Sequence, residues 1–370
     1  MNIKAINIPI SNKINFCGGK EKKIISTAFS LPKDIFIKKA EKTIAKDSTE
    51  SNIEQIYDSV FRDSLKLNLM ANPFFNTLKI EKPTIKISQD SDLVKVAAYN
   101  FPSNTISLSE KIINSDLYMC YSQDKQTGGM TTYGIYPKDD VKEEIKVGKS
   151  LNLKVKTLKL NEKEKEFYIT SSIAHELRHF FQSHLMASTE EISTLYINEQ
   201  IEAVDKYNAL IPAYNEHLKQ IQECVDNCRK NKIKVIPELI KILNTQKPKS
   251  YVDTTYAKNY KPNFLIGKNS SINFSLYSLD YRTMTPLDLY DAATKQTKSS
   301  KNNDQSYYSN LLEIDAYNHG FEYICKSKVK NPHGLRDIVI EGMAQNAQRS
   351  YLLGMSFAKN LNQLPKTMQE

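Results

Sequence analysis

The stretch SSIAHELRHFFQ, at residues 171–182, decides how the rest of the chain is interpreted. It contains the pattern His-Glu-x-x-His, at His175, Glu176 and His179, in a chain with six histidines among 370 residues. Residues four apart on a helix lie nearly above one another, so the two imidazoles would face one point in space. Zinc binds such nitrogens at about 2.0–2.1 Å, and Glu176 would reach a water bound to it. The motif therefore predicts a metal site, provided that the stretch is helical.

The surrounding sequence predicts such a helix. Asn161 is expected as the N-cap, with Glu164 completing a capping box. Neither proline nor glycine occurs from there to Leu185, and apolar or small residues recur at helical spacing: Phe167, Thr170, Ile173, Ala174, Leu177, Phe181 and Leu185. The 3.6-residue period places this stripe roughly 160° from the two histidines. We expect a helix that packs on one side and carries its imidazoles on the other; the alternative is an amphipathic helix with two incidental histidines.

A zinc ion held by two imidazoles needs another protein ligand. His184 is excluded, because five residues rotate a helix by about 140° and turn it away from His179. A glutamate is expected instead, and we place it at Glu313. Its helical neighbours include the small residues Ala316 and Gly320, which would let that helix approach the first one closely.

Other assignments stay open for this third ligand. Glu199 lies twenty residues after His179, a spacing similar to that of thermolysin-like enzymes, and Glu202 is close to it. Both lie on a polar helix face, which is typical of solvent-exposed residues. Glu313 could instead cap the helix that begins near Asn310. Asp315 could be an acceptor that orients a ligand imidazole.

The patterns along the chain predict an α+β fold, with a small N-terminal mixed sheet packed on the motif helix and a mostly helical C-terminal half. Strands are expected at 78–80, 84–87, 93–99, 105–109 and 151–160, with a turn at 100–104. Helices are expected at 32–71, 204–228, 235–243, 306–326 and 335–360. A capping box at 188–191 is expected to open the long helix that includes 204–228. Residues 121–149 and 293–304 are expected to form polar loops, and the loop at 121–149 is expected to act as a lid. Four parts follow: an N-terminal arm at 1–30, a lobe with the motif helix at 31–186, a helical hairpin and connector at 187–305, and a helical lobe at 306–370.

The composition of the chain limits the kinds of partner and the cellular compartment that we expect. The net charge is +9, but the lysines are spread along the chain, so we expect no nucleic-acid partner. No run approaches the roughly eighteen apolar residues of a membrane span, and the first twenty residues lack the apolar core of a secretory signal. Five scattered cysteines do not suggest a disulfide framework. We therefore expect a reduced, cytoplasmic protein, with no prediction of oligomeric state.

The motif at 175–179 is followed by Gln182, and a later segment has the sequence Glu-x-Asp-Ala-Tyr at 313–317. Together they resemble the gluzincin branch of the zincin metallopeptidases, and most of all poorly characterised bacterial members. The resemblance covers about residues 90–186 and 306–326. It implies a small sheet over an active-site helix, and a helical second half that carries the glutamate ligand. Arg178 departs from the family pattern, which prefers an uncharged residue there, and the long separation of His179 from Glu313 requires the helical insertion to loop out.

These observations predict a zinc-dependent metallopeptidase that acts on a peptide or protein, with Glu176 as general base. A strand upstream of the motif helix could offer its edge to an extended peptide, or could be an ordinary sheet strand. Candidate transition-state donors are His319, Tyr317, Tyr307 and His333. Two other functions stay open: an inactive zincin-fold binding protein, and a basic helical adaptor in which the motif is accidental.

Overall fold

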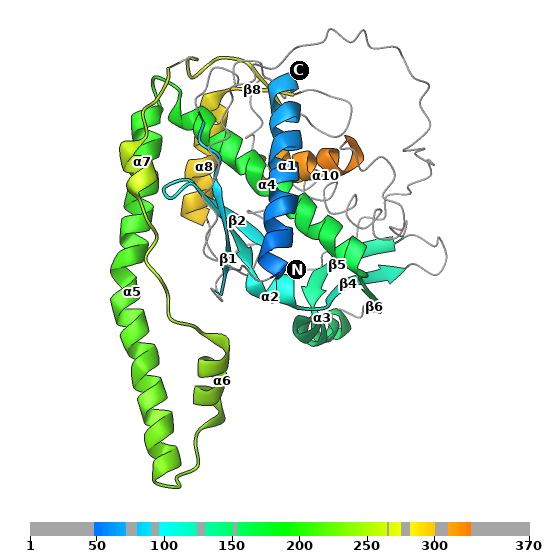
Figure 1. The fold of residues 1–370 in the computed structure, drawn as a ribbon, viewed down its shortest axis with the longest axis vertical. Helices are drawn as coiled ribbons and strands as arrows, with labels where there is room; N and C mark the ends of the chain where they lie inside the picture. The colour runs from blue at the N-terminus through cyan, green and yellow to red at the C-terminus, as the bar shows by residue number, and fades with distance from the viewer. Residues whose placement is uncertain are drawn as a thin grey trace. The chain divides into compact units, whose positions relative to one another are not determined.

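The structure is a computed structural model that describes residues 48–71, 80–89, 96–123, 130–150, 154–264, 266–274, 282–299 and 310–326. The chain divides into two units, Met1–Lys46 and Asp47–Glu370, and all described residues lie in the second. Their fold is α+β, as predicted (Figure 1). The arm predicted at 1–30 and the helices predicted at 335–360 lie outside the described residues.

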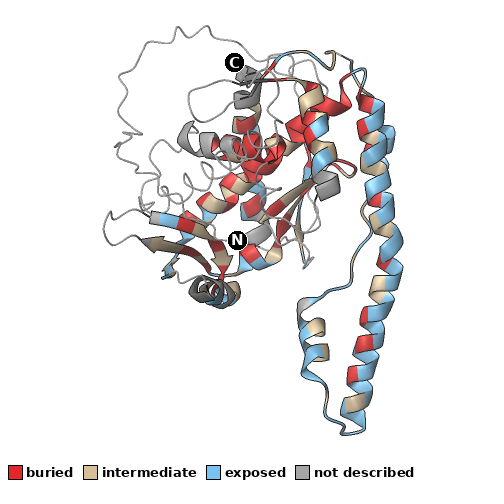
Figure 2. Ribbon diagram, turned by 180° about the vertical axis from the view of Figure 1, so that it is seen from behind, coloured by how far each residue is buried: buried red, intermediate tan, exposed pale blue. Residues whose placement is uncertain are grey.

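Helix α4 (Glu162–Ala187) carries the motif and contacts both the sheet and the C-terminal helices (Figure 1). The predicted capping box is confirmed: Asn161 Oδ1 accepts the Glu164 N–H at 3.0 Å, and the Glu164 carboxylate accepts the Asn161 N–H at 2.7 Å. The expectation of one packed side is wrong, because nearly every residue from Ile173 to Ala187 is buried (Figure 2). Polar groups on this helix must therefore find partners inside the protein.

A small mixed sheet packs on α4, as predicted. Its strand order is β1 (Thr84–Ser88), β3 (Thr105–Ser109), β2 (Ala97–Asn100), with β1 parallel and β2 antiparallel to β3. Alternation along β3 points Ile106 and Leu108 inward, and both are fully buried in a cluster with Ile173 and Leu177 of α4. Helix α1 (Ser48–Ala71) adds its own apolar side chains to the same cluster.

A second sheet corrects the loop predicted at 121–149. Strands β5 (Met130–Pro137), β4 (Leu117–Gln123) and β6 (Lys156–Lys159) form an antiparallel sheet in that order, and helix α3 (Lys138–Ser150) follows β5. Short helix α2 (Glu110–Asn114) links the two sheets. The polar residues and glycines of this segment suggested a loop, but its Tyr and Thr residues favour strands once a partner strand is present. Gly134 lies beside the bulge at Cys120 and Tyr121, where a glycine is common.

The second half is mostly helical. Helices α5 (Ser193–Lys230) and α6 (Pro237–Thr245) form the predicted hairpin, and Pro212 lies within α5. Next come α7 (Thr255–Asn259), the strand pair β7 (Ile272–Phe274) and β8 (Arg282–Met284), α8 (Pro286–Ser299) and α10 (Leu311–Lys326). The polar loop predicted at 293–304 is wrong over 293–299, which belong to α8.

The capping box predicted at 188–191 is also wrong, since α5 begins at Ser193 and Ile192 caps it without a side-chain bond. The side chains that suggested the box have other partners. The Thr189 hydroxyl donates to the Leu185 carbonyl at 2.8 Å, and the Glu191 carboxylate accepts the Lys268 N–H at 3.0 Å.

Among the described helices, none has the length and apolar character that crossing a bilayer requires.

Candidate metal centre

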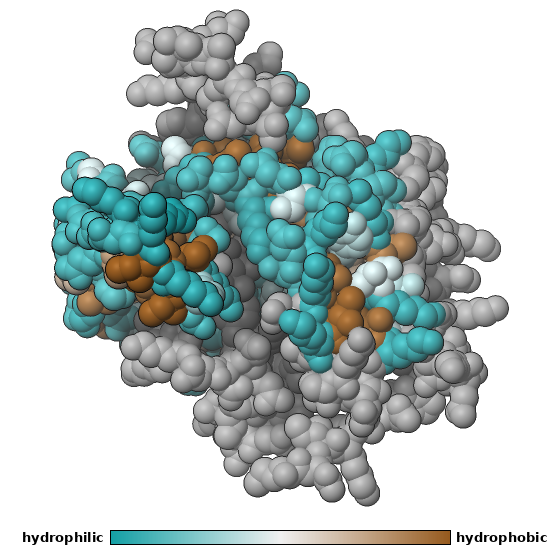
Figure 3. Space-filling view, turned by 90° about the horizontal axis from the view of Figure 1, so that it is seen from below, coloured by the Kyte–Doolittle hydropathy of each residue, from teal (hydrophilic) through white to brown (hydrophobic). Residues whose placement is uncertain are grey.

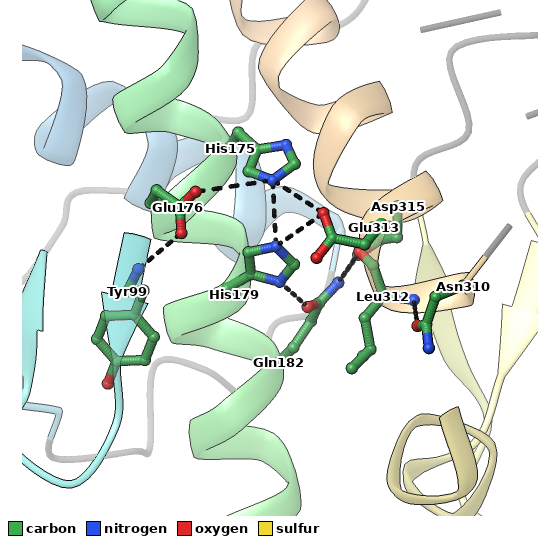
Figure 4. Close-up of polar contacts among 9 residues, drawn as sticks. All are labelled: Tyr99, His175, Glu176, His179, Gln182, Asn310, Leu312, Glu313 and Asp315. Atoms are coloured by element: carbon green, nitrogen blue, oxygen red, sulfur yellow. Dashed lines mark hydrogen bonds and ion pairs between the residues drawn. The ribbon is translucent and has the colours of Figure 1, made fainter. Parts of the chain in front are cut away.

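Helices α4 and α10 bring three of the predicted residues to one point (Figure 4). His175 Nε2 lies 3.1 Å from His179 Nε2, and Glu313 Oε2 lies 3.4 Å and 3.6 Å from these two nitrogens. Within the described ranges, this is the one group of three or more His, Cys, Asp or Glu side chains with converging ligand atoms. The predicted third residue is therefore placed beside the motif histidines.

Small residues allow α10 to lie against α4, as the sequence predicted. Ala316 is fully buried, and a Cβ atom added to Gly320 would lie 2.9 Å from the carbonyl oxygen of Ser171. Such a contact is shorter than van der Waals packing allows, so a larger residue would push the helices apart. Close approach of the two backbones is what lets a short glutamate side chain reach His175 and His179.

The capping alternative for Glu313 is not supported. Asn310 caps the start of α10 itself, because its Oδ1 accepts the Leu312 N–H at 2.9 Å, and its Nδ2 donates to the Ala292 carbonyl at 2.8 Å. The carboxylate of Glu313 lies at the two imidazoles instead (Figure 4).

The spacing of the three atoms fits a divalent metal ion. Ligand atoms at about 2.0–2.1 Å around a tetrahedral ion lie about 3.3–3.4 Å from one another. The three observed separations are 3.1, 3.4 and 3.6 Å, which bracket that edge length. Two imidazoles and a carboxylate are also a donor set that zinc accepts, with a fourth position for water. The residues present therefore suit a tetrahedral metal site.

Gln182 determines which nitrogen of His179 faces the centre. Its Nε2 donates to the Leu312 carbonyl at 3.1 Å and to Asp315 Oδ2 at 2.7 Å, so its Oε1 is left as an acceptor for the Nδ1–H of His179, at 2.8 Å. The Nε2 atom of His179 then faces Glu313 and His175. Asp315, predicted as a direct partner of an imidazole, acts on His179 through Gln182.

A buried ion pair with Asp315 accounts for the charged residue at Arg178, where the zincin pattern prefers an uncharged one. The Arg178 guanidinium binds Asp315 in bidentate fashion, with Nε at 2.7 Å from Oδ2 and Nη2 at 3.1 Å from Oδ1. Both side chains are buried, so each charge depends on the other for compensation. Sequence reasoning missed this pair. The sequence shows the two residues only separately, because the burial of α4, which makes the arginine require a carboxylate, is seen only in the fold.

Glu176 is held beside the centre without belonging to the group of three. Its Oε2 accepts the backbone N–H of Tyr99, on β2, at 2.7 Å, and its Oε1 lies 3.8 Å from His175 Nε2 (Figure 4). One oxygen is thus fixed by the sheet while the other faces the centre. The sequence did not predict this role of Tyr99, because a backbone donor leaves no trace in residue identity.

Charges at the centre stabilise one another. Burial by itself would lower the pKa of His179, but the Glu313 carboxylate beside it raises the pKa to about 9. Burial would raise the pKa of Glu313, but the two imidazoles hold it well below its usual range. His175 is held by ring contact with Tyr317, at 4.4 Å between centroids, and its Nδ1 is buried with no hydrogen-bond partner among the described residues. The buried Glu313 carboxylate therefore strongly favours positive charge at the centre.

The remaining sequence candidates lie elsewhere. His184 bonds Phe180 and Tyr256, as its exclusion predicted, and His319 bonds the Ser64 hydroxyl at 2.8 Å. Glu199 accepts the Tyr290 hydroxyl, and Glu202 pairs with Lys206 at the surface, so neither reaches the centre. Tyr307 and His333 lie outside the described residues.

Comparisons of the chain with protein-family models, with curated proteins and with solved structures found no match.

Proposed function

We propose that the protein is a zinc-dependent metallopeptidase, with His175, His179 and Glu313 as the ligands and Glu176 as the general base. The observation that carries the proposal is the spacing of the three ligand atoms at tetrahedral edge lengths, with the Glu176 carboxylate alongside. The motif and the Glu-x-Asp-Ala-Tyr segment, which resemble those of gluzincins, support the same chemistry.

Each residue has a defined part in the proposed reaction. When bound, zinc would lower the pKa of a bound water towards about 7 and polarise the scissile carbonyl. Glu176 Oε1 accepts the proton of the attacking water, while Oε2 stays on the Tyr99 N–H. Glu176 Oε1 then passes this proton to the leaving amine. Throughout the reaction, the hydrogen bond from His179 Nδ1–H to Gln182 Oε1 keeps the Nε2 lone pair of His179 directed at the centre.

An extended peptide is the substrate class that the neighbouring sheet favours. Strand β2 is an outer strand of its described sheet, and the Tyr99 N–H that binds Glu176 is on this strand. A peptide added along such an edge would lie next to Glu176 and the centre.

The burial of the centre favours a second candidate, a structural metal that fixes α10 on α4. His175, Glu176 and Glu313 are all buried, and structural zinc sites are typically closed to solvent. In that case metal removal would unfold the protein, and no substrate would be cleaved.

One comparison separates the candidates: cleavage of labelled casein by the full-length protein beside its Glu176→Gln variant, with zinc content measured for both. The glutamine keeps an oxygen for the Tyr99 N–H but cannot accept a proton. The peptidase predicts one zinc per chain in both proteins and a loss of about 10²–10⁴-fold in cleavage rate in the variant. Equal rates would refute the general-base role. Zinc without cleavage in the wild type would favour the structural metal or an inactive binding protein, and the absence of stoichiometric zinc would favour the basic adaptor.

A further inference from the structure

The end of the α5–α6 hairpin carries exposed aliphatic side chains among cations. Helix α5 spans 38 residues, or about 57 Å at 1.5 Å per residue. Its last turn and the link to α6 extend beyond the part that contacts α4 and α7 (Figure 1). In that link, Ile233 and Ile236 are each 59% exposed. Figure 3 views this end of the hairpin and shows hydrophobic side chains surrounded by hydrophilic ones.

The charges at this tip have one sign. Between Asp226 and Glu238 the chain has four cations, Arg229, Lys230, Lys232 and Lys234, and no acidic residue. Arg229 lies 3.7 Å from Asp226, whereas the three lysines make no ion pair with any described residue. The tip thus combines uncompensated positive charge with exposed aliphatic surface.

Backbone hydrogen bonds also fix the conformation of the tip. The Ile233 N–H donates to the Cys228 carbonyl at 2.8 Å, and the Lys232 N–H donates to the Arg229 carbonyl at 3.2 Å. This is the Schellman arrangement at a helix C-terminus, in which the residue at the position of Lys232 is usually glycine. Lys232 has a φ of 55°, in the left-handed region that favours glycine. A lysine is therefore held at the tip in a conformation that a glycine would adopt more easily.

We propose that this tip, formed by residues 229–236, docks on an anionic lipid surface. The lysines would lie at the headgroups, and Ile233 and Ile236 would enter the boundary with the acyl chains. A convex tip suits a fluid surface that closes around it, whereas a protein partner would have to supply a matching hollow. Nucleic acid would use the cations but would gain nothing from two exposed isoleucines. The tip contains no residue of the metal centre, so this proposal does not rest on the proposed function.

The test is co-sedimentation of the full-length protein with vesicles at low ionic strength. Vesicles that contain phosphatidylserine should bind the protein, vesicles of phosphatidylcholine alone should not, and added salt should weaken the binding. Neutralising Lys230, Lys232 and Lys234 to glutamine should lower the partition coefficient about a hundredfold, at about fivefold per lysine. Replacing Ile233 and Ile236 by serine should lower it about tenfold or more.

Two variants keep the test specific. Lys232→Gly suits the local backbone, so it should fold normally and still lose about fivefold in partition. The matched control neutralises Lys138, Lys142 and Lys163, which are exposed on α3 and α4, and changes the net charge equally. This control should bind like the wild type.

Three outcomes would overturn the proposal. These are no binding of the wild type to anionic vesicles, an equal loss in the control and the tip variants, and lipid binding unaffected by the isoleucine changes. Binding to polyglutamate or RNA in place of vesicles would identify an acidic protein or a nucleic acid as the partner instead.

Discussion

Helix α4 carries histidines in two opposite environments. His175 and His179 face the Glu313 carboxylate of α10, and this charge raises the pKa of His179 to about 9. His184 lies in an aromatic pocket with Phe101 and Tyr256, where burial lowers its pKa to about 4. Its Nδ1–H donates to the Phe180 carbonyl, so its Nε2 accepts the Tyr256 hydroxyl.

The difference shows what turns a histidine into a candidate metal ligand on this helix. His184 is more deeply buried than the motif histidines, but both of its nitrogens have neutral partners and no described carboxylate faces it. At the centre, a buried carboxylate and two converging nitrogens require a compensating positive charge. The approach of α10, rather than the imidazoles alone, therefore creates the site.

The largest effect is expected from breaking the pair that holds α10 in place. Arg178→Met would leave Asp315 as a buried charge without its guanidinium partner, which costs about 3–5 kcal/mol in similar pairs. Urea unfolding should show this loss as a lower midpoint with an unchanged slope. Metal binding should weaken as well, because Asp315 also holds Gln182.

The double variant Arg178→Met with Asp315→Leu serves as the control. It removes both charges, so it should recover most of the lost stability. If it is no more stable than the single variant, the ion pair is not what joins the helices.

The aromatic pocket should respond to acid. The pKa of His184 is about 4 in the folded protein and about 6.5 when unfolded, so between these values only the unfolded state binds the proton. The free energy of unfolding should be unaffected by this group above pH 6.5, and should fall by about 3 kcal/mol as the pH decreases to 4. Urea midpoints from pH 4 to pH 8 would measure the change.

Replacing His184 by glutamine should remove this part of the pH dependence, at a lower overall stability. His217 is exposed on α5, so His217→Gln should retain the wild-type profile. Matching pH slopes in the wild type and His184→Gln would argue against the account of the pocket.

A smaller effect is expected at Gln182. Gln182→Leu removes the acceptor for His179 Nδ1–H and the donor to Asp315, while filling a similar volume. Residues that orient a metal-bound histidine typically change metal affinity by about 10–100-fold, and we expect a loss of this size in a zinc-chelator competition. Gln222→Leu, on the surface of α5, should have no effect.

Local signals predicted the motif helix well. The Asn161 cap depends on residues three positions apart, and Ala316 and Gly320 indicated a face that another helix could approach. These small residues favour Glu313 over Glu199 as the third ligand from the sequence alone. These features are encoded within one or two helical turns, where sequence patterns are most informative.

Long-range contacts explain what the sequence did not predict. Strand β5 is stabilised by pairing with β4, which polar and turn-forming residues concealed. The capping box at 188–191 failed because Thr189 and Glu191 have other partners. Arg178 and Asp315 were each noted, but only the fold shows that they bind each other, 137 positions apart in the chain.

The most direct test of the central claim is the zinc content of the purified wild-type protein beside the His179→Ala, Glu313→Ala and Glu199→Ala variants. We expect one zinc per chain in the wild type and in Glu199→Ala, and little or none in the other two, because each loses a ligand. Zinc retained by Glu313→Ala, or lost from Glu199→Ala, would contradict a centre built from His175, His179 and Glu313.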